Sequence, residues 1–205
     1  MIRSKYLENI VSRETMEKIA KYHDILLENN SKMSIISKNS EKIAVERHYE
    51  DSAQLYRYLD RSDKEILDIG TGGGLPGIIL DLIKHDVSLD FNTHLLDKSS
   101  KKCHFLKKVN SFLDLDLKIH NSDVMDLKQK DFTTIVSRAF KPMKEFFDII
   151  TASGLCYKKI LLMKGENFMN EFSEAKKHFE INCEYYDSIT NQASKIFVIK
   201  SVSKI

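Results

Sequence analysis

The stretch that decides the fold reads Ile66-Leu67-Asp68-Ile69-Gly70-Thr71-Gly72-Gly73-Gly74-Leu75-Pro76-Gly77-Ile78-Ile79-Leu80. The chain has seven glycines, and five of them lie between Gly70 and Gly77. Because glycine weakens helices and strands, this clustering indicates a loop that needs positive φ angles or passes close to a ligand. The apolar run before the loop is typical of a buried strand, and the run from Ile78 to Ile83 of a helix packed on that strand.

A strand, tight loop and helix of this kind bind ligands outside the carboxyl end of the strand. The spacing Gly72-x-Gly74-x-x-Gly77 also satisfies the dinucleotide pattern of dehydrogenases. Asp68 argues against that ligand, because its carboxylate would accept hydrogen bonds from an amine but would repel a pyrophosphate. S-adenosylmethionine carries an ammonium and a sulfonium group and no phosphate, so we expect it as the cofactor. A tight turn that binds no ligand is the alternative.

Length and composition predict one globular α/β protein. We expect a helical extension over residues 1–60, packed on a core over residues 61–205. Charged residues make up 30% of the chain and apolar residues 42%, which allows a sizeable core. The formal charge of +2 neither requires nor excludes nucleic acid as a partner.

Cysteine usage and hydropathy indicate a reduced compartment. Cys103, Cys156 and Cys183 are odd in number and have no C-x-x-C pairing, so neither a disulfide framework nor a metal site is expected. The amino-terminal residues contain no signal-peptide apolar core, and no run of 18 apolar residues occurs. We therefore expect a cytoplasmic protein without membrane contact.

Two helices are predicted before the sheet. The first runs from Ser12, a plausible N-cap, to about Glu28, and polar residues over 29–34 end it. The second runs from about Glu41 to Leu59, with core markers Ile43, Val45, Ala53, Leu55 and Tyr58. His48 and Asp51 are three residues apart and can both point toward the glycine loop, although a local hydrogen-bonded pair explains the same spacing.

Four further strands are predicted, each followed by polar residues: Leu89–Leu96, Leu117–His120, Thr133–Val136 and Lys159–Met163. A final strand is predicted over Lys195–Val202. In a doubly wound parallel sheet, the residues that follow these strands meet at one edge. Asp97, Arg138 and Lys164 should therefore lie beside Asp68. A carboxylate such as Asp97 can accept hydrogen bonds from both ribose hydroxyls, and a helix N-cap is its alternative role.

The most basic part of the chain is a helix predicted from Ser99 to Phe112, with Phe105, Val109 and Phe112 on its buried face. Its other faces carry the candidate contacts to RNA phosphates, which are Lys98, Lys101, Lys102, His104 and Lys108. A solvated charged face without a partner is the common alternative.

Several motifs along nearly the whole chain match one family: Glu46-Arg47-His48-Tyr49-Glu50-Asp51-Ser52, the loop from Asp68 to Gly77, Leu95-Leu96-Asp97, Lys101-Lys102-Cys103-His104-Phe105-Leu106, Ser137-Arg138-Ala139-Phe140, Lys164-Gly165 and Val198-Ile199-Lys200. The chain thereby resembles RsmG, also called GidB, the bacterial small-subunit ribosomal RNA guanine-N7 methyltransferases. The Leu75-Pro76-Gly77 extension and the Ser137-Arg138-Ala139 motif are the most specific parts of this resemblance.

The resemblance implies a Rossmann-like, S-adenosylmethionine-dependent methyltransferase fold with Gly70 and Leu75 in the loop that cradles the cofactor. It places Val124 and Met125 against the adenosine part and Arg138 at the family's binding arginine. The full expected cofactor site is Asp68, Gly70, Gly72, Leu75, Asp97, Val124, Met125 and Arg138.

The chain departs from the family at three places. Met125 stands where the family usually has glutamate, and Lys98 where it has serine. The segment Met33-Ser34-Ile35-Ile36 replaces an asparagine-rich one.

The implied reaction needs no general base, because guanine N7 already presents a free lone pair at neutral pH. We expect Arg138 and Lys164, with His48 as a third candidate, to position the base or a phosphate. The expected partner is 16S ribosomal RNA or a small-subunit assembly intermediate, and the chain is expected to be a monomer. A catalytically idle RNA-binding or assembly protein and, more remotely, a nicotinamide oxidoreductase are the alternatives.

Overall fold

The computed structural model describes residues 2–33 and 35–205, and of residues 32 and 39 the backbone only. Met1, in the amino-terminal stretch, and Ser34, in the segment that replaces the family's asparagine-rich one, lie outside these described residues.

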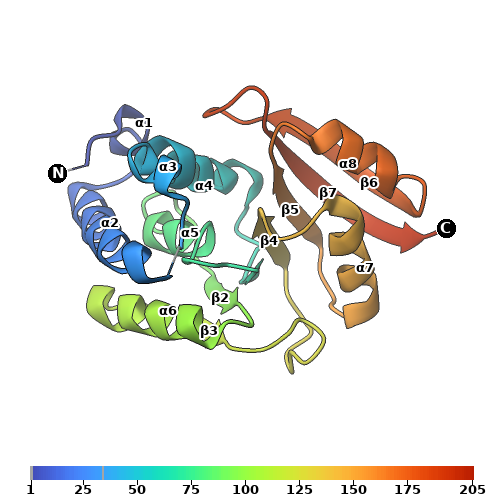
Figure 1. Ribbon diagram of the computed structural model, residues 1–205, viewed down its shortest axis with the longest axis horizontal. Coiled ribbons are helices and arrows are strands. Elements are labelled where there is room, and N and C mark those ends of the chain that lie inside the picture. The colour runs from blue at the N-terminus through green and yellow to red at the C-terminus, as the bar shows by residue number, and fades with distance from the viewer. Residues whose placement is uncertain (1, 34) are drawn as a thin grey trace.

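A sheet of seven strands runs through the described part of the chain (Figure 1). Its order is β3 (Lys118–His120), β2 (Asn92–Leu96), β1 (Glu65–Ile69), β4 (Thr134–Arg138), β5 (Lys159–Lys164), β7 (Lys195–Lys204) and β6 (Phe179–Asp187). The first five are parallel, and β7 is antiparallel to both β5 and β6. The strand order reverses between β1 and β4, which is where doubly wound sheets bind their ligands. The predicted doubly wound fold is confirmed.

Helices cover both faces of the sheet, which explains why the central parallel strands are apolar on both sides. Ile66 and Leu67 of β1 point to opposite faces, and both are fully buried. On one face lie α2 (Arg13–Met33), α5 (Gly77–Ile83) and α6 (Ser100–Leu113), and on the other lie α7 (Met143–Ser153) and α8 (Phe168–Ala175). The short helix α1 (Lys5–Glu8) packs against α2.

Helix α2 is longer than predicted. Ser12 caps its start, since the Ser12 hydroxyl accepts a hydrogen bond from the Thr15 amide at 3.2 Å. The helix continues through residues 29–33, where the side chains of Asn29 and Asn30 find hydrogen-bond partners. Asn30 donates to the Ile36 carbonyl at 3.0 Å and accepts from the Ile36 amide at 2.8 Å. A pattern of polar residues therefore did not end the helix.

The single helix predicted from Glu41 to Leu59 is wrong. The chain forms α3 (Lys38–Glu41), a π-helical turn η1 (Val45–Glu50), α4 (Asp51–Ala53) and a 3₁₀ turn η2 (Gln54–Tyr58). Ala53 and Leu55 are buried as predicted, whereas Ile43 is 46% exposed. Single π-helical turns are rare and often occur at functional sites, and this one carries His48 into the cleft described below.

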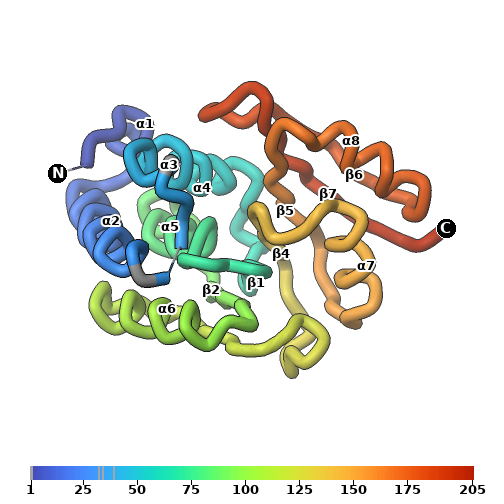
Figure 2. The backbone as a smooth tube through the Cα atoms, viewed as in Figure 1, coloured from blue at the N-terminus to red at the C-terminus, as the bar shows by residue number. Residues whose placement is uncertain are grey.

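Two carboxyl-terminal elements, α8 and β6, were not predicted. The turn over residues 188–194 joins β6 to β7 and lies beside the amino-terminal segment around α4, far away in the sequence (Figure 2). Phe112 was predicted to be buried, but it is 61% exposed because its side chain lies off the packed face of α6 that holds Phe105 and Val109. The division of the chain at residue 60 stays a prediction, since residues from both parts share one core.

Candidate functional site

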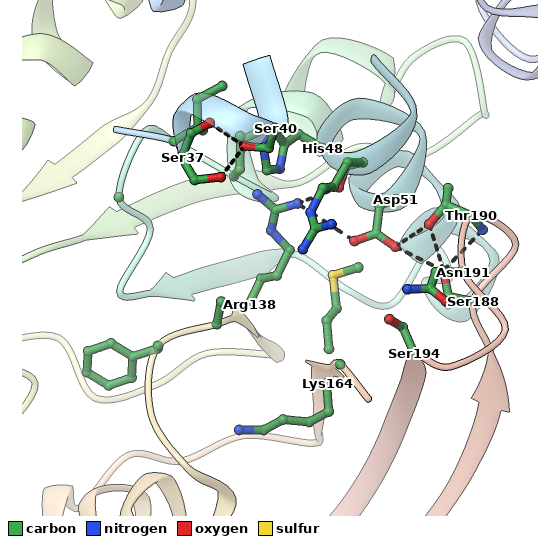
Figure 3. A pocket seen from close by; sticks show the side chains of 18 of the residues that line it. Ser37, Ser40, His48, Asp51, Arg138, Lys164, Ser188, Thr190, Asn191 and Ser194 are labelled. Carbon is green, nitrogen blue, oxygen red and sulfur yellow. Dashed lines mark hydrogen bonds and ion pairs between the residues drawn. The ribbon is translucent and has the colours of Figure 1, made fainter. Parts of the chain in front are cut away.

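A cleft of about 820 Å³ opens at the carboxyl ends of β1, β4 and β5. The glycine loop forms one wall, and the turn over residues 188–194 contributes to the opposite wall (Figure 3). Arg138, Lys164 and His48 all line it, together with Gly70, Gly72 and Leu75. This volume is that of a typical small-molecule site, and its position is the switch point of the sheet.

The glycine loop has the backbone that its composition requires. Gly70 and Gly72 have φ angles of +71° and +61°, in the left-handed region. A Cβ at Gly70 would lie 2.2 Å from the Phe140 ring, so the loop and the Arg138 segment are packed together. A Cβ at Gly72 would meet only the Gly70 carbonyl oxygen, at 3.9 Å, and would project into open space. The loop thus presents bare backbone to the cleft at Gly72.

The amino-terminal extension supports this loop from outside. The Tyr22 hydroxyl of α2 donates to the Gly73 carbonyl at 2.8 Å, and Tyr22 is fully buried. A Cβ at Gly73 would lie 2.3 Å from the Ile35 side chain. The extension therefore shapes the glycine loop, and no local pattern in the sequence indicated this role for Tyr22.

The structure differs from the prediction at Asp68. This residue lies behind the loop and does not line the cleft. Its Oδ2 accepts hydrogen bonds from the Thr71 hydroxyl at 2.6 Å and the Gly77 amide at 2.8 Å. Oδ1 is buried without a hydrogen-bond partner among the described residues. Asp68 thus organises the loop and the start of α5, and its field favours a cationic ligand over an anionic one.

Burial raises the pKa of Asp68 to about 6, and the hydrogen bonds from Thr71 and Gly77 oppose this shift. The carboxylate is therefore mainly ionised at neutral pH. An enclosed negative charge with one unpartnered oxygen suits a site that binds a positively charged ligand.

Asp97 holds the loop from its other side. Its Oδ2 accepts from the Gly72 amide at 3.1 Å and pairs with the Lys102 ammonium at 3.4 Å, while Oδ1 accepts from the Ser99 amide at 2.9 Å. The alternative role of Asp97 as a helix N-cap is wrong, because Ser99 caps α6 and its hydroxyl accepts from the Lys102 amide. Asp97 does not line the cleft, and its contact with a ribose stays a prediction. Lys102 was predicted on an RNA-binding face, but it lines the cleft because it pairs with Asp97.

The residues expected at the adenosine part lie off the cleft wall. Val124 is 4% exposed and belongs to the core under α7, and Met125 is 50% exposed. The Met125 amide donates to Asp123 Oδ1 at 3.1 Å, which fixes the local turn. Neither side chain lines the cleft, so contact between them and a cofactor stays a prediction.

Arg138 lies at the end of β4, directly beside the glycine loop on neighbouring β1. Its Nη1 donates to the Arg47 carbonyl at 3.1 Å and is 3.7 Å from Asp51 Oδ2 (Figure 3). Burial lowers the pKa of Arg138, and the charge of Asp51 opposes that shift. The guanidinium stays charged and is held at the centre of the cleft.

Lys164 is 7% exposed, and its ammonium is already paired with Glu171 at 2.8 Å and donates to the Lys141 carbonyl. Sequence patterns had not indicated Glu171, which also accepts from the Met143 amide at 2.9 Å. Lys164 therefore links the end of β5 to the starts of α7 and α8. An RNA group that bound the Lys164 ammonium would share it with Glu171 and the Lys141 carbonyl.

His48 is buried and neutral. Burial, with the nearby charges of Arg138 and Arg47, lowers the pKa of His48 to about 3. Its Nε2 is 2.9 Å from the Ser40 hydroxyl, and its Nδ1 is buried without a partner among the described residues. The alternative of a hydrogen-bonded pair between His48 and Asp51 is wrong, because each has other partners.

The remaining candidate contacts to RNA lie on the outside of α6 or, for Lys98, just before it. Lys98, Lys101, His104 and Lys108 are exposed and lie outside the lining of the cleft. This leaves the three lysine side chains and the His104 ring accessible to a polyanion, as the prediction requires. Within residues 2–33 and 35–205, no group of three or more His, Cys, Asp or Glu side chains is placed to hold a metal ion. No described helix has the length and apolar character that crossing a membrane requires.

Comparison with known proteins gives consistent matches. The model of the GidB family, described as rRNA small subunit methyltransferase G, matches residues 15–196. The chain is 35% identical to the ribosomal RNA small subunit methyltransferase G of Pelagibacter ubique (strain HTCC1062), with 95% of this chain and 92% of that protein covered. For the protein of the same name from Rickettsia bellii (strain OSU 85-389), the identity is 32% and the shares are 95% and 98%.

Solved structures show the same fold at low sequence identity. A mutant of MtNAS in complex with S-adenosylmethionine has a TM-score of 0.58 at 14% identity, with 96% of this chain and 74% of that chain covered. A SAM dependent methyltransferase from Aquifex aeolicus has a TM-score of 0.56 at 12% identity, with shares of 83% and 98%.

Proposed function

The chain belongs to the family of rRNA small subunit methyltransferase G, and from this membership we propose that it transfers the methyl group of S-adenosylmethionine to N7 of a guanine in small-subunit ribosomal RNA. The observation that carries the proposal is the cleft at the switch point of the sheet, with the bare glycine loop on one wall and Arg138 on another. The same expectation had come from the glycine loop and the resemblance alone.

The residues present fit S-adenosylmethionine. Gly72 leaves space for close approach of a ligand, and the buried charge of Asp68 lies under the loop. Gly70, Gly72 and Leu75 would hold the amino-acid part, and Asp97 the ribose. A pyrophosphate would meet the fields of both carboxylates, which disfavours a dinucleotide.

When bound, S-adenosylmethionine supplies an electrophilic methyl group, so that a nitrogen lone pair forms the new N–C bond while the S–C bond breaks and its electrons stay on sulfur. The protein then has to position the base rather than move a proton. Orientation of this kind contributes on the order of 7–11 kcal/mol to the lowering of a barrier. Neutral His48 and charged Arg138 supply hydrogen-bonding groups at the cleft without acting as a base.

The exposed lysines of α6 are the proposed contacts for RNA phosphates, beside the cleft. Because side chains cannot read the deep, narrow major groove of paired RNA, the target guanine should lie in an opened or immature region. The partner is then ribosomal RNA or a small-subunit assembly intermediate. Action as a cytoplasmic monomer stays a prediction.

Two measurements test this function. Calorimetry with S-adenosylmethionine and with NAD should show binding of the first and none of the second. Labelled-methyl transfer to small-subunit RNA from cells lacking the protein, followed by mapping, should place the label on N7 of one guanine. NAD binding without a response to S-adenosylmethionine would refute the cofactor assignment, and cofactor binding without transfer would favour an idle RNA-binding protein.

The role of Arg138 has its own test. Arg138→Ala should abolish methyl transfer while the circular dichroism spectrum stays that of the wild type. Lys144→Ala is the matched control, because Lys144 is an ion-paired cation on α7, outside the cleft. Wild-type methyl incorporation by Arg138→Ala would remove Arg138 from the proposed role.

A further inference from the structure

The Asp51 side chain lines the cleft and accepts three hydrogen bonds, and sequence patterns had given it only a general orientation toward the loop. Its Oδ1 accepts hydrogen bonds from Gln54 Nε2 at 2.8 Å, Ser188 Oγ at 3.0 Å and Thr190 Oγ1 at 3.0 Å. Gln54 in turn accepts from the Ile189 amide at 2.9 Å. These contacts fix the rotation of the carboxylate, since one oxygen is committed to three donors (Figure 3).

The other oxygen of Asp51 is left for the cleft. Oδ2 accepts no hydrogen bond from the described residues, and its near neighbour is Arg138 Nη1 at 3.7 Å, which is an ion pair beyond hydrogen-bond distance. Both side chains are 16% exposed and line the cleft. The cleft therefore presents an acceptor, Asp51 Oδ2, next to a donor, the Arg138 guanidinium.

This pairing of groups matches one purine edge. Guanine presents adjacent O6 and N1–H, an acceptor beside a donor, whereas adenine presents an amino donor beside the N1 acceptor. Unpaired RNA bases are commonly read on this edge. An arginine next to a carboxylate thus complements guanine, and the same pair set against adenine would place donor on donor and acceptor on acceptor.

We propose that Asp51 and Arg138 together select guanine, with Arg138 donating to O6 and Asp51 Oδ2 accepting from N1–H. This inference rests on the proposed function and names the groups that choose its base. O6 lies between N1 and N7 on the purine. A base held this way directs N7 away from Asp51, to the side of Arg138 where β1 and the glycine loop lie. Its N7 lone pair stays free for the methyl group.

Asp51→Asn tests the proposal with little change of shape. The side-chain oxygen can still accept from Gln54, Ser188 and Thr190, and those donors hold the amide nitrogen where Oδ2 was. An NH₂ group there faces both Arg138 and the guanine N1–H with the wrong polarity. We expect kcat/KM on small-subunit RNA from cells lacking the protein to fall roughly 10- to 100-fold. The affinity for S-adenosylmethionine should stay that of the wild type.

A second measurement reads base choice directly. In ligand-observed NMR, guanosine and inosine 5′-monophosphates should bind the wild type in preference to adenosine 5′-monophosphate, because inosine keeps O6 and N1–H. Asp51→Asn should lose this preference. Lys144→Ala is the control, since Lys144 is an ion-paired cation on α7 outside the cleft, and it should keep the preference.

The outcomes separate three cases. Equal binding of the three nucleotides by the wild type, or wild-type kcat/KM in Asp51→Asn, would overturn the inference. The same loss of base preference in Lys144→Ala would also overturn it, because the preference would then not depend on the pair in the cleft. A wild type that binds guanosine selectively but transfers no methyl group would support base selection while refuting the proposed function.

Discussion

Acidification should destabilise this protein through His48. The ring is buried at 8% exposure beside the charges of Arg138 and Arg47, and its pKa is lowered to about 3 from an ordinary 6.5. Above pH 6.5 the ring is neutral in both the folded and unfolded states, so His48 contributes no pH dependence there. As pH falls below 6.5, His48 becomes protonated in the unfolded chain but stays neutral in the folded chain. The free energy of unfolding therefore falls with pH until about pH 3, where the folded chain is protonated as well.

The size of the effect follows from the two pKa values. The whole shift corresponds to a loss of about 5 kcal/mol, at about 1.4 kcal/mol per pKa unit. At about pH 5 the same linkage gives a loss of about 2 kcal/mol relative to pH 8. A protein with a typical stability of about 5–15 kcal/mol would show this clearly.

The assay is urea unfolding of the wild type and of His48→Gln at pH 8 and pH 5. The Gln amide can keep a hydrogen bond to Ser40 and does not titrate, so the difference between the two proteins isolates His48 from the other histidines. The free energy of unfolding of the wild type should fall by about 2 kcal/mol more than that of the variant. Equal losses in the two proteins would refute the assignment of a buried neutral ring.

Three further predictions concern the loop, the core and the basic helix. Gly72→Ala and Gly154→Ala both place a Cβ at a positive φ in open space, so each should lower the free energy of unfolding in urea by about 1–2 kcal/mol. Only Gly72→Ala should weaken binding of S-adenosylmethionine in calorimetry. Phe147→Ala should lower the free energy of unfolding by about 3–5 kcal/mol because Phe147 is fully buried, whereas Phe112→Ala should change it by less than about 0.5 kcal/mol. Lys101→Ala should reduce the slope of log affinity for RNA against log salt by about 0.7, and an unchanged slope would remove the exposed face of α6 from the interface.

Local patterns predicted the parts of the fold that depend on nearby residues. The clustered glycines gave the loop and its left-handed angles, and the apolar runs gave β1 and α5, because steric limits on φ and burial act within a few residues. The edge at which Arg138 and Lys164 meet followed from parallel strands, whose carboxyl ends lie together. The family followed from motifs that lie within short stretches.

Tertiary structure decided what depends on distant partners. Polar residues at the end of α2 stay helical because Asn30 bonds to Ile36, and Lys102 lines the cleft while its ammonium pairs with Asp97. Asp68 was predicted to face a ligand, but its carboxylate is used behind the loop.

The clearest case is Asp51, which bonds across 137 residues to Ser188 and presents one oxygen beside Arg138. The sequence by itself determined the strand, loop and helix that form the glycine-loop wall of the cleft, since each rests on local steric and hydrophobic rules. Arg138 and Asp51 came to lie side by side in the cleft only when the turn between β6 and β7 packed on the amino-terminal segment. No local pattern encodes such a contact, because its free energy depends on groups that are adjacent only in the folded chain.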